Sequence, residues 1–349
     1  MNELIKYFID NKIEEALVKN ITVYGYQYNY EHLLISSCTK YLFEDYIVNE
    51  DYMIKEGMEN RPGKIYDKHY VVVHDTASSA ITANGLAHAK YVTNGGGGTS
   101  WHYTCSSDGI YHHIPDFENA YHAGDGGRTY EFFETNVYGN NINPTVSISD
   151  DGYFEIDGVK SVVLAPTLDG EIVQTDRIND KGVKVVIKDG MYYIGNTYYN
   201  KTYRYIANAG GNNNGIGIES CLNEGSDIYY TWQKLAKLVA HLVKDNNLSL
   251  NDVKPHHYFS GKPCPMTMRK ALMWESFMEL VKFEYDMITR FSDYTVKLTS
   301  HNLEYINELG RIIKQDEINK TVSYTITVTK DNLSESHTFD IVIPGKSNN

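Results

Sequence analysis

The sequence has few cysteines, and those it has lie far apart. Cys38, Cys105, Cys221 and Cys264 are spread through 349 residues, and no two of them form a close Cys-x-x-Cys pair. In a chain made in a reducing cytoplasm such cysteines are expected to be free thiols, with a Cys105–Cys221 disulfide as the alternative. We therefore expect Cys264 alone to be recruited by a metal.

Long hydrophobic runs and an excess of positive charge are missing too. Acidic residues interrupt the apolar positions of the first ten residues, which argues against a signal peptide, and no later window is apolar enough to span a bilayer. The 32 Lys and Arg residues stand against 45 Asp and Glu residues, a net charge of −13. A phosphate-binding surface needs a basic patch, and none stands out. We expect no membrane span and no nucleic acid as the main partner, whereas a neutral or zwitterionic polymer is allowed.

The chain does contain enough apolar material to fold. Hydrophobic residues make up 42% of it and tyrosine alone occurs 30 times, which excludes general disorder. Its length allows two or three domains.

The stretch 254–265 carries the strongest chemical signal. It places His256 eight residues before Cys264, and Lys262 two residues before that cysteine, in a loop stiffened by one glycine and two prolines. Such a loop can hold an imidazole and a thiolate as two ligands of one zinc ion. A catalytic zinc usually has three protein ligands, and His74, which ends the apolar run 70–73, is the expected third.

Five segments also occur in the order found in a known enzyme family. They are residues 72–77, 100–103, 119–124, 215–219 and 256–265. Through them, about residues 65–130 and 210–280 resemble the zinc N-acetylmuramoyl-L-alanine amidases, which share a fold with peptidoglycan recognition proteins. The residues of these segments are most similar to those of amidases from phages and prophages of Gram-positive bacteria.

The resemblance implies a fold and a reaction. The fold class is α/β, with a mixed central β-sheet flanked by helices. His74, His256 and Cys264 would hold one zinc ion, which activates a water for amide cleavage. The bond cut would join the lactyl carbonyl of N-acetylmuramic acid to the L-alanine of the stem peptide in bacterial peptidoglycan.

The resemblance also implies roles for four further residues. Glu219 would take a proton from the attacking water and return it to the leaving amine, and Lys262 would stabilise the oxyanion. His122 is expected along the substrate groove. Trp101, also expected to contact substrate, stands where some relatives have a catalytic tyrosine, and this departure leaves the acid–base chemistry to Glu219.

Other interpretations of these residues remain open. His257 is the rival of His256 as a ligand, Glu219 could be a buried structural acid, and Lys262 could be a solvated loop residue. A cysteine peptidase would use Cys105 or Cys221 as its nucleophile, but neither cysteine opens a helix, where the dipole would lower its pKa. A non-catalytic peptidoglycan-binding virion structural protein is the alternative function.

The flanking regions differ in character from the matched segments. The apolar spacing at 1–60 predicts a largely helical region, with a boundary at the Pro-Gly pair near residue 61 and an amidase domain over 61–289. Short strands and Asp-Gly turns predict a β-rich insertion over 130–210. Alternating residues over 290–349 predict a small C-terminal β module that serves in wall binding or virion attachment.

Without a signal peptide, a wall hydrolase must reach its substrate by another route. We expect either a tail-associated enzyme carried on a phage virion, with other tail proteins as partners, or an endolysin held in the host cytoplasm until lysis.

Overall fold

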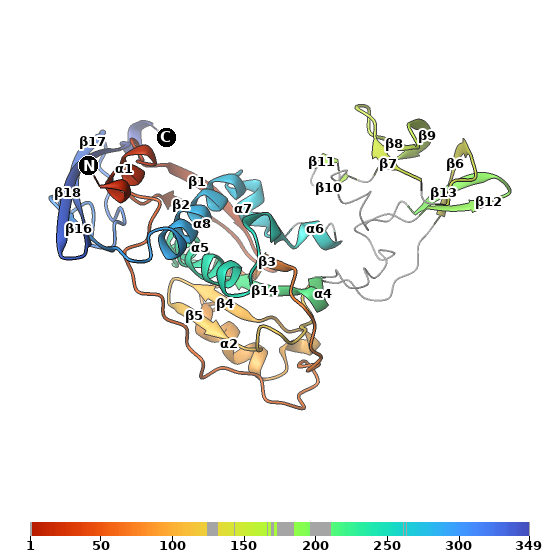
Figure 1. Ribbon diagram of the computed structural model, residues 1–349, viewed down its shortest axis with the longest axis horizontal. Coiled ribbons are helices and arrows are strands. Elements are labelled where there is room, and N and C mark those ends of the chain that lie inside the picture. Colours follow the sequence, from red (N-terminus) through yellow and green to blue (C-terminus); the bar gives the residue numbers. More distant parts are fainter. Residues whose placement is uncertain are drawn as a thin grey trace.

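A computed structural model describes residues 2–123, 132–142, 144–165, 167–168, 171–172, 185–195, 211–260, 262 and 264–348. The centre of the molecule is a five-stranded sheet in the order β15-β3-β14-β4-β5 (Figure 1). Its strands are β3 (Tyr70–Asp75), β4 (Tyr103–Ser106), β5 (Gly109–His112), β14 (Gly215–Ser220) and β15 (Val253–Pro255).

The central strands are apolar because both faces of the sheet are covered. β14 pairs in parallel with β3 and β4, β15 pairs in parallel with β3, and β5 runs antiparallel to β4. A parallel strand covered on both faces reads as a nearly continuous hydrophobic run, as the three valines of β3 do. This mixed sheet flanked by helices confirms the predicted α/β fold class.

Helices pack on the sheet. Their bounds are α2 (Gly85–Thr93), α5 (Ile228–Asp245), α7 (Met266–Lys270) and α8 (Trp274–Thr289), with one-turn helices α4 (Gly211–Asn214) and α6 (His257–Ser260) and 3-10 turns η1 (Gly96–Gly98), η3 (Leu250–Asp252) and η4 (Lys346–Asn348). Side chains alternate across a strand, so Val71 and Val73 share the core cluster of α5, while Val72 packs with Phe259 in a separate cluster. His74, two residues after Val72, therefore projects from the face away from α5.

The apolar spacing over 266–288 predicts one helix, but the structure has two. α7 and α8 are separate, and Leu272 between them has a left-handed φ of 57°. The apolar spacing continues through both helices, but α8 lies along α5 whereas α7 contacts β1. Periodicity alone does not reveal such a change of direction.

The prediction of a largely helical region over 1–60 is wrong. Only α1 (Glu3–Asp10) is helical there, capped by the side chain of Asn2, and the next elements form a hairpin of β1 (Val18–Tyr24) and β2 (Asn29–Ile35). The β-branched residues of β1 and the turn after it are strand and hairpin signals that the helical interpretation overlooked. The inner side chains Ile21, Val23 and Leu34 join the main core.

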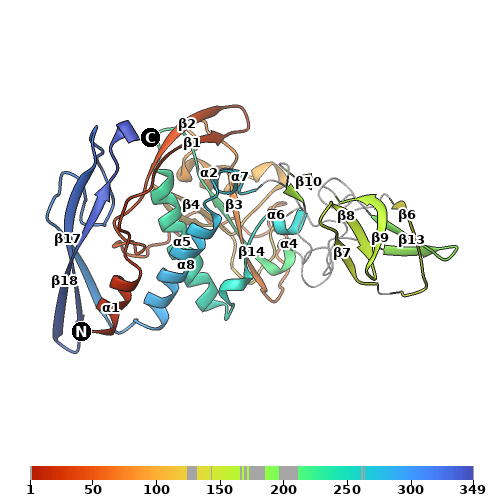
Figure 2. The same cartoon turned by 90° about the horizontal axis from the view of Figure 1, so that it is seen from above.

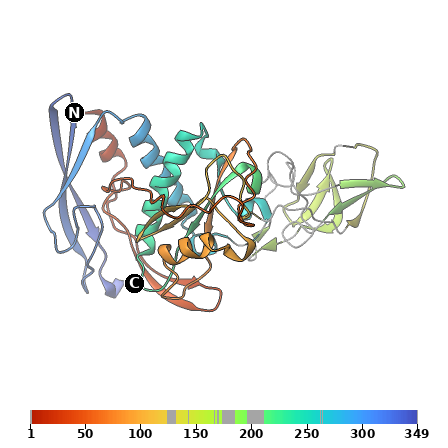
Figure 3. The same ribbon diagram turned by 90° about the horizontal axis from the view of Figure 1, so that it is seen from below.

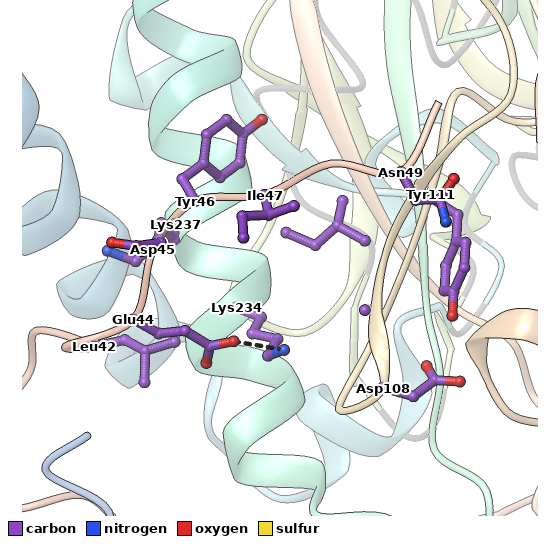
Figure 4. Close-up of a pocket in the computed structure, with 12 residues that line it drawn as sticks. Leu42, Glu44, Asp45, Tyr46, Ile47, Asn49, Asp108, Tyr111, Lys234 and Lys237 are labelled. Atoms are coloured by element: carbon purple, nitrogen blue, oxygen red, sulfur yellow. Dashed lines mark ion pairs between the residues drawn. The ribbon is translucent and has the colours of Figure 1, made fainter. Parts of the chain in front are cut away.

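Residues 36–69 form an irregular arm along β5 and α5. Asn49 pairs with Tyr111 and so extends the edge of β5. Glu44 forms an ion pair with Lys234 of α5 at 2.9 Å, and Figure 4 shows this pair beside the other arm residues. The arm, the β4–β5 turn and α5 together enclose a pocket of about 230 Å³.

The described part of the predicted insertion consists of short antiparallel strands. Two three-stranded sheets, β7-β8-β9 and β12-β13-β6, contact each other through β6 and β9. The bounds are β6 (Phe132–Tyr138), β7 (Val146–Ile148), β8 (Tyr153–Ile156), β9 (Val159–Leu164), β12 (Val185–Lys188) and β13 (Met191–Gly195), with the two-residue strands β10 (Thr167–Leu168) and β11 (Glu171–Ile172). Figure 2 shows this β-rich unit at the opposite end of the molecule from the C-terminal sheet. The predicted strand character of the region is thus present, while parts of the 130–210 range lie outside the described residues.

The C-terminal region is a three-stranded antiparallel sheet, as its alternation predicts. It comprises β16 (Thr295–Ser300), β17 (Lys320–Lys330) and β18 (Leu333–Ile343), and the turn at Asp331 and Asn332 has positive φ at both residues, as a tight hairpin requires. The sheet is not separate from the N-terminus. Its inner face shares one core cluster with α1 and α8, and Figure 3 shows α1 beside the sheet.

None of the helices within the described ranges combines the length and apolar character that crossing a membrane requires.

The shared core predicts that the first helix stabilises the C-terminal sheet. The ring of Phe8 is buried and lies 5.2 Å from that of Phe283, measured between centroids. Replacing Phe8 by Ala should lower the free energy of unfolding by about 3–5 kcal/mol, the usual loss for a buried phenylalanine. Urea titration followed by tyrosine fluorescence measures it.

The matched control is Leu303→Ala, since that side chain in the C-terminal region is 61% exposed. It should change the unfolding free energy by less than about 0.5 kcal/mol. Equal losses in the two variants would show that α1 does not share the C-terminal core.

Candidate metal centre and active-site pocket

The carboxyl ends of three adjacent parallel strands bring the predicted site residues together. In the register of the sheet, Glu219 of β14 lies beside His74 of β3, and Pro255 of β15 lies beside Val73. His256 follows directly, and its backbone N–H donates to the carbonyl of Val73 at 3.0 Å. Binding sites in sheets of this kind form at the carboxyl edge, and the three side chains meet there.

His74, His256 and Cys264 form a cluster of two nitrogen donors and one sulfur donor, called the metal-ligand cluster below. Their ligand atoms lie within 4.8 Å of one another, and all three residues are buried. Cys264 Sγ lies 3.8 Å from His74 Nδ1. Two ligands held tetrahedrally at zinc distances of about 2.1 and 2.3 Å would be about 3.6 Å apart. The donor set and its spacing therefore fit a zinc ion.

Backbone and side-chain contacts determine which ring nitrogen of His74 and of His256 could bind a metal. His256 Nε2 lies 3.1 Å from the carbonyl oxygen of Ala123, which can only accept, so this nitrogen carries the hydrogen and Nδ1 has the lone pair. His74 Nε2 lies 2.9 Å from Nδ1 of His122. When His74 Nδ1 binds a metal, its Nε2–H donates to His122, an arrangement that orients metal-binding histidines generally.

His122 is itself held in place from two sides. Its backbone N–H and that of Ala123 both donate to the side-chain oxygen of Asn212, at 2.8 and 2.6 Å. Its ring lies over Gly217, where any β-carbon would overlap the imidazole at 2.7 Å. The structure thus places His122 behind the ligand His74, whereas its sequence position had suggested the substrate groove.

The loop that carries Cys264 is fastened to β3. The backbone N–H of His257 donates to the Cys264 carbonyl at 2.9 Å, and the carboxylate of Asp75 accepts from the Thr267 N–H at 2.9 Å. Asp75 adjoins His74. One short stretch of β3 therefore supplies His74 to the cluster and anchors the segment that follows Cys264. Sequence reasoning missed Asp75, because its partner lies 192 residues away along the chain.

Burial shifts the pKa values of His74 and Cys264 so that their neutral forms are favoured. Burial lowers the pKa of His74 well below its usual value, and the nearby His256, His122 and Lys262 add to this. Burial likewise raises the pKa of the Cys264 thiol, with further contributions from Asp75 and Glu219. Both shifts favour the neutral forms of these two residues, so a metal bound here would have to displace the thiol proton.

Glu219 lies beside the cluster and reaches a pocket. Its Oε1 is 3.8 Å from His74 Nδ1, and its side chain is 17% exposed. Its Oε2 is buried and accepts no hydrogen bond from any residue in the described part of the chain. Burial raises the pKa of Glu219 to about 8, and the positive charge of Lys262 opposes that rise. A carboxylate so placed can exchange a proton near neutral pH.

The pocket next to Glu219 has a volume of about 550 Å³. Trp101, Thr76 and Ser78 are among the residues that line it. The Trp101 ring is buried and its indole N–H donates to Thr104 Oγ1 at 2.8 Å, which fixes its orientation. Of the two residues predicted for the substrate groove, the structure therefore brings Trp101 to the pocket.

A family comparison adds to this geometry. The family model described as N-acetylmuramoyl-L-alanine amidase matches residues 64–267, more than half of the chain. The chain belongs to this amidase family. The match spans β3, β14, β15 and all three residues of the metal-ligand cluster.

Curated relatives of the chain come from Bacillus subtilis. It is 28% identical to the N-acetylmuramoyl-L-alanine amidase XlyA over 225 residues, 64% of this chain and 48% of XlyA. It is also 28% identical to the N-acetylmuramoyl-L-alanine amidase CwlH over 221 residues, 63% of this chain and 55% of CwlH. The chain thus spans about half the length of these relatives.

Solved structures similar to the chain include the catalytic domain of XlyA. The TM-score is 0.42 at 26% identity, covering 67% of this chain and 99% of that one. A mutant endolysin from Bacillus subtilis has a TM-score of 0.43 at 26% identity, covering 68% and 99%.

The structure does not favour a cysteine peptidase that uses Cys105 or Cys221 as its nucleophile. All four cysteines fall within the described residues, and each is a buried free thiol, as predicted. Cys221 Sγ lies 3.7 Å from His88 Nδ1, but burial raises the pKa of Cys221 and of Cys105. A reactive cysteine needs a lowered pKa, so neither is a suitable nucleophile.

The contact between His74 and His122 predicts a role in metal affinity. His122→Ala removes the acceptor that orients His74 and should weaken zinc binding by about 10–100-fold, the usual effect of losing such a partner. Competition with a chromophoric chelator measures the affinity. His122→Gln, whose side-chain oxygen can accept the same hydrogen bond, should recover most of it.

His337→Ala, at an exposed position on β18, is the matched control and should leave zinc affinity unchanged. If His122→Ala binds zinc as tightly as the unaltered chain, the contact does not orient the ligand.

Proposed function

We propose that the chain is a zinc-dependent amidase that hydrolyses the bond between N-acetylmuramic acid and L-alanine in bacterial peptidoglycan. The observation that carries the proposal is the convergence of His74, His256 and Cys264 beside Glu219, at the edge of a pocket in a member of this family. When bound, zinc supplies a Lewis acid that polarises a carbonyl and lowers the pKa of water from 15.7 to about 7.

Glu219 acts as the general base and then the general acid. Its carboxylate takes a proton from the attacking water and returns it to the nitrogen of L-alanine as the amide bond breaks. Its carboxyl group can do both because it is next to the ligand cluster and reaches the pocket. The buried surroundings keep its pKa high enough to return the proton to the leaving amine.

Lys262 supplies positive charge on the other side of the reacting carbonyl. It lies in the loop that carries Cys264, it is exposed, and its charge acts on His74, Glu219 and Cys264. Such a charge stabilises the oxyanion that develops as water adds to the carbonyl carbon. The exposed position allows Lys262 to approach the substrate from the solvent side.

We also propose a phage setting for this activity, either as a tail-associated wall hydrolase or as an endolysin. The support is the similarity of the motifs around His74, Glu219 and Cys264 to those of phage and prophage amidases. Peptide mass spectrometry of purified virions distinguishes the two, because only a tail-associated enzyme is present in the particle. The roles of the C-terminal sheet in wall binding or virion attachment belong to the same proposal.

The bond that is cut can be identified directly. Digestion of purified muropeptides should release free stem peptides that begin with L-alanine, and intact saccharides, as detected by mass spectrometry. Zinc removal should abolish this and zinc addition should restore it. Binding to cell walls without any new product would instead support the non-catalytic virion protein.

Loss of either proposed catalytic side chain should slow turnover and spare the metal. Glu219→Gln and Lys262→Ala should each lower kcat by about 100-fold, the usual size of a general-base or oxyanion contribution, while zinc content stays at one ion per chain. Glu308→Gln, at an exposed carboxylate of the C-terminal region, is the control and should keep full activity. Full activity of either site variant would remove that residue from the mechanism.

A further inference from the structure

The hairpin β1–β2 lies outside the matched family region, yet it is firmly docked on the catalytic core. Its inner side chains belong to the main core, as described above. Two hydrogen bonds add to this packing: Lys19 Nζ donates to the carbonyl of Ala271 at 2.7 Å, and the Tyr30 hydroxyl donates to the carbonyl of Leu222 at 2.6 Å. The hairpin is thus held at both of its strands.

The tip of the hairpin meets the loop that follows His74. Ser79 Oγ donates to the carbonyl of Tyr28, and Gly25 lies so close to Ser79 that a β-carbon at position 25 would overlap the Ser79 side chain. Because this approach is only possible without a side chain at Gly25, the turn is positioned against the active-site loop. Figure 2 shows the hairpin alongside the helices that cover the catalytic sheet.

This contact places Tyr26 in the wall of the active-site pocket. Tyr26 lines the same pocket as Glu219, Trp101 and Tyr91. Its side chain is 86% exposed, so the ring is available to a ligand and is presented by a fixed backbone. Aromatic side chains from both the family domain and the N-terminal hairpin therefore line the pocket.

The lining indicates which part of peptidoglycan the pocket accepts. The described residues that line it include no Lys or Arg, and burial lowers the pKa of His88, which disfavours a positive charge on that imidazole. Stem peptides carry carboxylates, which basic side chains would recognise. Aromatic rings together with small polar residues such as Thr76 and Ser78 instead suit a neutral sugar ring, which has apolar C–H faces and polar edges.

We propose that Tyr26 is a substrate-specificity residue that stacks on a sugar of the glycan strand and so extends the active-site pocket beyond the family domain. This inference rests on the proposed amidase function, because it takes peptidoglycan as the substrate. It assigns the pocket to the saccharide side of the scissile bond.

Binding of a glycan that cannot be cleaved tests this assignment. The probe is a tetrasaccharide of alternating N-acetylglucosamine and N-acetylmuramic acid without stem peptides, titrated calorimetrically into the zinc-loaded full chain. Tyr26→Ala should weaken binding about tenfold, the effect expected from loss of one aromatic contact, while Tyr26→Phe should bind as the unaltered chain does. Tyr28→Ala, on the same hairpin, is 54% exposed and outside the pocket lining, so it should have no effect.

Kinetics on muropeptides supplies the second readout. Tyr26→Ala should raise KM about tenfold on substrates with an intact glycan strand and leave kcat within about twofold, because the ring binds substrate but does not take part in bond cleavage. Unchanged tetrasaccharide affinity in Tyr26→Ala would overturn the proposal. Weaker binding of a free stem peptide, with the tetrasaccharide unaffected, would overturn it too and assign the pocket to the peptide.

Failure of this inference can be told apart from failure of the amidase proposal. If the unaltered chain cuts muropeptides and Tyr26→Ala behaves identically, only the role of Tyr26 is lost. If the unaltered chain releases no stem peptide, the amidase proposal is lost, whatever the tetrasaccharide titration shows.

Discussion

The parallel pairing of β3 with β14 and β15 is the interaction on which the rest of the site depends. It sets His74 beside Glu219 in register and delivers His256 directly after the neighbouring strand. Sheet hydrogen bonds fix these backbone positions, and the alternation of side chains sends His74 and Glu219 to the same face. A slip of one residue in β3 would turn His74 toward α5 and dismantle the ligand cluster.

Around this register the chain holds each ligand by a second contact. The Ala123 carbonyl fixes the tautomer of His256, His122 orients His74, and Asp75 secures the segment after Cys264. Each of these contacts limits how far the ring or the backbone beside a ligand can move. The result is a rigid group of donors that does not have to be assembled when a metal arrives.

The parts outside the family domain are integrated with it. The first helix shares a core with α8 and the C-terminal sheet, while the hairpin that follows packs on the main core and reaches the pocket. The N-terminal region had been predicted as a largely helical region because local apolar spacing was given more weight than its β-branched residues. The spacing of apolar residues indicates which positions are buried. Where helical spacing and β-branched residues favour different structures, the segments that pack against these positions decide between helix and strand.

The sequence by itself determined the α/β class and the residues that meet at the candidate metal centre. An apolar strand ending in His74 and a stiff loop containing His256 and Cys264 are local patterns, and their chemistry can be read without a fold. Only the tertiary structure decided that His122 lies behind His74, that Asp75 anchors α7, and that Tyr26 lines the pocket. Each of these depends on contacts between segments far apart in the chain, and such contacts arise from packing, which leaves no periodic trace in the sequence.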